Sequence, residues 1–97
     1  MTPLAQAVLR AGADAADRST DWPAESWDSV RQAGALGWSV PAAFGGAALP
    51  PADRLARTEA VAAACLTTAF ALSQHEAAVR QLLRGPAHVQ QRYLPDV

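Results

Sequence analysis

Residues 54–85 read RLARTEAVAAACLTTAFALSQHEAAVRQLLRG, a composition that is typical of helix. It is rich in strong helix formers and contains neither proline nor glycine before its last residue. Side chains at alternating spacings of four and three residues would share one helix face, and they form a stripe: Val61, Cys65, Thr68, Leu72, His75, Val79 and Leu82. The sequence therefore predicts helix from about Pro51 to Arg84, ended by Gly85 and Pro86.

A single helix over residues 51–84 would be too long for this chain. It would measure about 50 Å at 1.5 Å per residue, whereas a globule of this size has a radius of gyration of about 12–13 Å. We therefore expect a break near the β-branched pair Thr67-Thr68, which would disturb the regular spacing of the stripe. Leu66 and Phe70 lie off the stripe, which predicts burial on more than one side of the helix.

Proline and glycine residues mark three further helices. The first is expected over residues 3–16, the second from Pro23 towards Gly34 and Gly37, and the last over residues 86–95. Leu4, Val8 and Leu9 form one apolar stripe on the first of these helices, and Trp27, Val30 and Leu36 share one side of the second. In the last helix the expected inward-facing residues are Val89, Tyr93 and Leu94. Because no strand-like alternation persists, the predicted fold class is all-α, a bundle of five or six helices forming a single helical domain over residues 1–97.

The stretch GWSVPAAFGGAAL, residues 37–49, interrupts the helices. Val40-Pro41 predicts extended backbone, and Gly45-Gly46 can adopt positive φ at no steric cost. Glycine and proline mark turns far more often than ligand sites. Taken alone, the stretch is therefore interpreted as a turn between helices, anchored by Trp38 and Phe44.

Composition excludes several classes of function. The net charge of −1 and the absence of a basic stripe argue against nucleic-acid binding. No apolar run reaches the roughly 18 residues of a membrane span, and no leader peptide is apparent, so we expect a cytoplasmic chain without a membrane partner. His75 and His88 lack further ligands at metal-binding spacing, Cys65 is expected to be a buried thiol, and no paired carboxylates or GxGxxG pattern occur. The sequence thus predicts no catalytic, metal-binding or cofactor-binding residue.

A set of short motifs follows the chain in a recognisable order. It comprises Pro23, Trp27, Gly34, Leu36-Gly37-Trp38, Val40-Pro41, Phe44-Gly45-Gly46, Glu59, Thr67-Thr68-Ala69, His75, Gly85 and Gln91-Arg92-Tyr93-Leu94-Pro95. Each motif alone is weak, but their order and spacing resemble the N-terminal helical domain of the acyl-CoA dehydrogenases. The resemblance covers residues 14–95, nearly the whole chain.

The resemblance implies a function shared with other domains. In that family a glutamate base removes the α-proton of an acyl thioester while the β-hydride passes to FAD. The family carries its flavin-binding segments and base in a middle β-domain and a C-terminal helical domain, which residues 1–97 lack. FAD is therefore implied for the complete enzyme and is not expected to bind this chain alone.

The resemblance also implies partners and binding residues. The N-terminal domain supplies one wall of the acyl pocket, and the matching positions here are Thr68, Ala69, Leu72 and His75, with Glu76 next to His75 at the end of the wall. The implied partners are the remaining domains or subunits of the flavoenzyme and an acyl-CoA or acyl-carrier thioester.

Two alternatives stay open at this stage. The first is a free-standing, non-catalytic helical module that binds a protein partner. The second is an unrelated helical bundle that matches by composition. Because much of the 51% hydrophobic content is alanine, we expect a modest core, marginal stability in isolation and a partner surface that completes the core.

Overall fold

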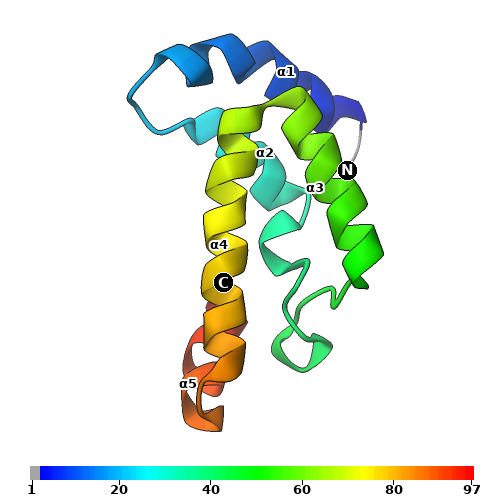
Figure 1. Cartoon of the computed structure of the whole chain (residues 1–97), viewed down its shortest axis with the longest axis vertical. Coiled ribbons are helices and arrows are strands. Elements are labelled where there is room, and N and C mark those ends of the chain that lie inside the picture. The colour runs from blue at the N-terminus through cyan, green and yellow to red at the C-terminus, as the bar shows by residue number, and fades with distance from the viewer. Residues whose placement is uncertain (1–2) are drawn as a thin grey trace.

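The computed structural model describes residues 3–97 and shows helices without strands in that range. The five α-helices are α1 (Pro3–Arg18), α2 (Ala24–Gln32), α3 (Pro51–Ala64), α4 (Leu66–Arg84) and α5 (Ala87–Tyr93). Short 3-10 turns are η1 (Ala35–Gly37), η2 (Ala42–Phe44) and η3 (Leu94–Asp96). The predicted all-α class with five or six helices is confirmed (Figure 1).

The predicted long helix breaks at Cys65, two residues before the expected pair Thr67-Thr68. Cys65 has extended dihedral angles (φ −156°, ψ 102°), so that it ends α3 and starts α4. The thiol Sγ of Cys65 lies 3.2 Å from the hydroxyl Oγ1 of Thr68, within hydrogen-bond distance. Thr68 thus supports the first turn of α4, and the break that was expected near Thr67-Thr68 lies two residues before that pair.

The stripe of residues 61–82 survives the break. Val61 and Leu72 have no exposed surface although they lie in different helices of the α3–α4 hairpin. His75 and Leu82 are partly buried, and the other members of the stripe are buried. In the α3–α4 hairpin the apolar faces of both helices pack against the same core. The residues of the stripe therefore share one buried side even though the helix is broken.

Three residues that were predicted to be buried are exposed. Leu66 and Phe70 are 73% and 68% exposed, because they lie on the side of α4 opposite the stripe. Tyr93 is also exposed, and the guanidinium carbon of Arg92 lies 5.6 Å from its ring centroid at the surface. The neighbouring Leu94, in contrast, is fully buried as expected.

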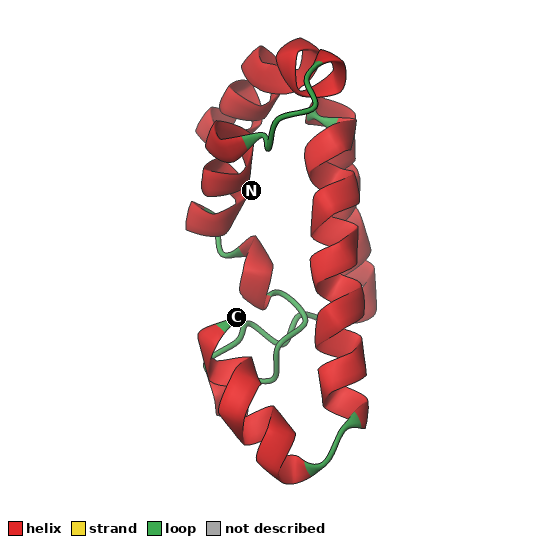
Figure 2. Ribbon diagram, turned by 90° about the vertical axis from the view of Figure 1, so that its left-hand side faces the viewer, coloured by secondary structure: helices red, strands yellow, loops and turns green. Residues whose placement is uncertain are grey.

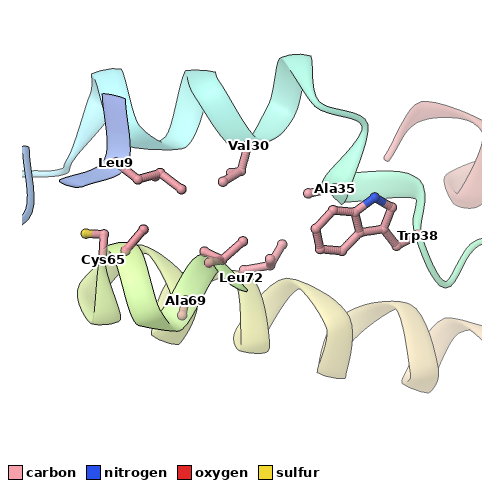
Figure 3. Close-up of a cluster of buried hydrophobic side chains, with 9 residues drawn as sticks. Leu9, Val30, Ala35, Trp38, Cys65, Ala69 and Leu72 are labelled. Atoms are coloured by element: carbon pink, nitrogen blue, oxygen red, sulfur yellow. The ribbon is translucent and has the colours of Figure 1, made fainter. Parts of the chain in front are cut away.

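The core consists of two clusters spaced along the molecule. In the larger cluster, side chains of α1, α2, α3, α4 and η1 meet, among them Leu9, Val30, Val61 and Leu72, with Trp38 at the end nearest the loop (Figure 3). The smaller cluster joins the loop, the second half of α4 and the C-terminal segment through Val40, Val79 and Leu94. Helix α4 therefore connects both clusters.

The loop between α2 and α3, residues 33–50, is called the glycine loop below, and it folds back on itself. The amide of Ala47 donates to the carbonyl of Gly37 (2.9 Å), and that of Leu49 donates to the carbonyl of Trp38 (2.9 Å). Gly45 has positive φ (83°) as expected, whereas Gly46 does not. A Cβ at Gly46 would overlap the carbonyl oxygen of Val40, so glycine is needed there for close approach of two backbones.

The molecule is elongated and thin. Its Cα radius of gyration is 13.8 Å and its extents are 41 × 26 × 18 Å (Figure 2). A compact chain of this length has a radius of gyration of about 12.5 Å. In the described part of the chain, eight large apolar residues are consequently exposed: Leu4, Val8, Trp22, Leu55, Leu66, Phe70, Tyr93 and Val97. Among residues 3–97, no helix combines the length and apolarity that crossing a membrane requires.

Candidate functional site

The four residues predicted to line an acyl pocket lie together on the inner face of α4. Thr68 and Leu72 have no exposed surface, and Ala69 is 6% exposed. Ala69 and Leu72 pack in the larger core cluster with residues such as Leu9 and Val30 (Figure 3). In this chain their side chains are therefore part of the interior of the helical domain.

His75, the fourth predicted residue, joins α4 to the glycine loop. Its Nε2 lies 2.8 Å from the carbonyl oxygen of Leu36 in η1. Because a carbonyl oxygen only accepts hydrogen bonds, Nε2 carries the proton and donates it. The imidazole also lies edge-on to Trp27, with ring centroids 6.4 Å apart. His75 thus has its Nε2 occupied by a backbone partner and packs as a structural residue.

The outer face of α4 carries the exposed apolar surface near the hairpin. Leu66 and Phe70 are one helical turn apart, so their side chains lie on the same face. The hydroxyl of Ser73 donates to the carbonyl of Phe70 (2.6 Å) and continues this face with a small polar residue. Helical spacing alone placed Leu66 and Phe70 off the main stripe, but it could not show that this side of α4 is exposed in the folded domain.

Among the side chains that the structure describes, three polar atoms are buried without a hydrogen-bond partner: Ser39 Oγ, Arg54 Nε and Glu76 Oε1. They come from the loop, α3 and α4, respectively. Arg54 and Glu76 are equally distant in sequence from Cys65, at matching positions of the α3–α4 hairpin. The resemblance had placed Glu76 beside the wall residues, but no sequence signal marked Ser39 or Arg54. A lone charged residue in a helix, such as Arg54, normally faces water.

The described residues hold no group of three or more histidine, cysteine, aspartate or glutamate side chains that could ligate a metal ion. The largest hollow beside the glycine loop has a volume of about 410 Å³. It is lined by Arg31, Gly34, Leu36, Gly37, Gly45, Gly46, Ala47 and Val97. Arg31, its one charged lining residue, is paired with Asp28.

The chain matches the family described as "Acyl-CoA dehydrogenase, N-terminal domain" over residues 2–97. It belongs to this family. No curated protein and no solved structure matches the chain. The match covers the α3–α4 hairpin, the glycine loop and the C-terminal segment described above.

Dehydrogenases of this family use FAD, and the hollow beside the glycine loop does not fit its pyrophosphate. A dinucleotide pyrophosphate needs free backbone amides at a helix N-terminus or several basic side chains. Beside the glycine loop, the amides of Gly46 and Ala47 already donate to the carbonyls of Pro41 and Gly37. Because Arg31 is paired as well, this hollow offers no donor set for the pyrophosphate.

Proposed function

We propose that this chain acts as the N-terminal domain of an acyl-CoA dehydrogenase-like flavoprotein that desaturates acyl thioesters at the α,β position. In this assembly it contributes part of the acyl pocket and part of the cover over the flavin. The observation that carries the proposal is the outer face of α4, where Leu66 and Phe70 project from a domain whose shortest extent is 18 Å. Fully burying such side chains is worth about 1.5–3 kcal/mol each, which favours a covering surface.

The predicted wall residues take an indirect role in this proposal. Thr68, Ala69 and Leu72 fix the distance between α4 and the rest of the domain, and His75 fixes α4 against η1. The acyl chain or the adjoining domain would then meet Leu66 and Phe70 on the opposite face. In this proposal the four residues determine where α4 lies, whereas Leu66 and Phe70 form the surface of α4 that meets the acyl chain or the adjoining domain.

The chemistry itself belongs to the other domains. In this proposal they supply FAD, the glutamate base that removes the α-proton, and the donors that polarise the thioester carbonyl. The partners are those domains or subunits and an acyl-CoA or acyl-carrier thioester. The present chain shapes the site and excludes water from it.

Reading the DNA that follows the codon for Val97 is the first test. We expect a continuing or neighbouring frame that encodes a flavin-binding β-domain and a C-terminal helical domain. Co-expression of both parts should yield a complex that contains flavin and whose flavin is bleached by an acyl thioester. If no such frame exists and the chain binds no flavoprotein subunit, the proposal is wrong. The alternative, a free-standing module that binds a protein partner, is then favoured.

A pair of variants tests the docking face. Phe70→Glu places a charge on the exposed outer face of α4 and should weaken co-purification with the flavin-binding part about tenfold or more. Leu55→Glu, at an equally exposed position of α3, is the control and should leave co-purification within about twofold. Equal effects of the two variants would show that the outer face of α4 is not the docking surface.

A further inference from the structure

The hollows along α1 and α2 adjoin one another and are together called the α1–α2 groove. Two hollows of about 260 and 340 Å³ lie along these helices, and both are lined by Val8 and Glu25. One extends towards the α1–α2 connection and Trp22, the other towards Leu4 and Ala33. Between Leu4 and Ser19 the groove follows α1 for about 22 Å at 1.5 Å per residue, the length of a helix of four turns.

The groove has a floor of small residues and apolar residues at both ends. Gly12, Ala15 and Ala16 line it from α1, and a Cβ at Gly12 would lie 3.1 Å from Ser26 Oγ. Leu4 and Trp22 are exposed at its two ends. The indole of Trp22 lies edge-on to Trp27, with centroids 5.1 Å apart, which fixes Trp22 while leaving it 58% exposed.

The rim of the groove is acidic. Asp21, Glu25 and Asp28 line the two hollows, and no arginine lines either of them. Asp28 is paired with Arg31. Within residues 3–97, Asp21 and Glu25 have no basic side chain within ion-pair distance. Two carboxylates beside an exposed indole favour a cationic occupant, because an aromatic face and a negative charge both attract ammonium and guanidinium groups.

We propose that the α1–α2 groove binds a basic amphipathic helix of a partner protein. The apolar side of that helix would lie on the small-residue floor between Leu4, Val8 and Trp22. Its lysine or arginine side chains would reach Asp21 and Glu25 and pack on Trp22. The charge of the rim selects this occupant over an anionic membrane surface or a nucleic acid, both of which two unpaired carboxylates would repel.

This inference does not depend on the proposed docking of α4. The groove belongs to α1 and α2, whereas Leu66 and Phe70 belong to the outer face of α4. A variant such as Phe70→Glu should therefore leave binding in the groove unchanged. Failure of one proposal can be distinguished from failure of the other.

The test uses a synthetic 18-residue helix with leucine at helical spacing of three and four residues and lysine on its other face. Titration into the ¹⁵N-labelled chain should shift amide resonances of α1, α2 and the connection between them. Glu25→Lys should weaken binding about tenfold, whereas Glu59→Lys, which makes the same charge change on α3, should weaken it less than threefold. Trp22→Ala should weaken binding about tenfold as well.

Two further peptides separate specific docking from general attraction of charges. A scrambled peptide of the same composition, which cannot form an amphipathic helix, and a peptide with glutamate in place of lysine should both bind at least about tenfold more weakly. The inference is overturned if the amphipathic peptide does not bind, or if the scrambled peptide binds equally well. It is also overturned if Glu25→Lys and Glu59→Lys have equal effects, or if the resonance shifts centre on Leu66 and Phe70.

Discussion

His75 and Leu36, 39 residues apart in sequence, are joined by a hydrogen bond of 2.8 Å from the imidazole Nε2 to the backbone carbonyl oxygen. This bond connects the middle of α4 to η1, at the start of the glycine loop. Since the loop lies between the two core clusters, the bond fixes its position relative to both. His75 is thus a positioning residue for the loop.

Replacing His75 tests this role. His75→Phe keeps an aromatic ring near Trp27 but leaves the carbonyl of Leu36 without its donor, so it should lower the free energy of unfolding by about 1–2 kcal/mol. His75→Gln keeps an N–H donor at a similar reach and should cost less. Urea unfolding followed by circular dichroism measures both. If the phenylalanine variant is as stable as the parent chain, the hydrogen bond contributes nothing and the positioning role is wrong.

The sequence predicted the helices well because their signals are local. Helix formers, proline at helix starts and glycine at helix ends placed all five helices within a few residues of their observed bounds. The break was expected near Thr67-Thr68 and lies two residues earlier, at Cys65, which is not β-branched. Propensity could not locate it, because the extended backbone of Cys65 results from packing of the hairpin and from the contact between its thiol and Thr68.

The two adjacent glycines of the loop should respond differently to the same substitution. Gly46→Ala forces a Cβ against the carbonyl of Val40 and should cost about 3 kcal/mol or more, since backbone must move. Gly45→Ala meets no neighbour and should cost about 1 kcal/mol, for its left-handed φ alone. Thermal unfolding of both variants checks the difference. Equal destabilisation would show that close approach of the backbone is not the reason for Gly46.

The candidate site could be predicted only in part, and α4 shows why. This helix has apolar residues on two sides, Leu72 and Val79 on one and Leu66 and Phe70 on the other. Spacing identifies each side but does not say which one faces the domain's own core, since both look equally apolar. The position of α1, α2 and the loop decides this, and those contacts are long-range. The acidic groove between α1 and α2 escaped notice for the same reason.

The two sides of α4 should therefore differ in stability measurements. Leu72→Ala removes a fully buried side chain from the larger core cluster and should cost about 3 kcal/mol. Phe70→Ala removes a mostly exposed ring and should change the free energy of unfolding by less than about 0.5 kcal/mol. Urea unfolding of the isolated chain measures both. A large cost for Phe70→Ala would mean that its ring is buried within the chain.

Trp22 and Trp27 offer a further comparison, since they touch each other but differ in burial. Trp27 is partly buried, packs against the larger core cluster and contacts the ring of His75. Trp27→Ala should therefore cost about 3 kcal/mol, because it opens a cavity and removes two ring contacts. Trp22→Ala loses one ring contact at an exposed position and should cost less than about 1 kcal/mol. Urea unfolding followed by far-ultraviolet circular dichroism is the suitable measurement, because tryptophan fluorescence itself changes in both variants. A near-zero effect of Trp27→Ala would show that α2 is held to the bundle by Val30 and its neighbours alone.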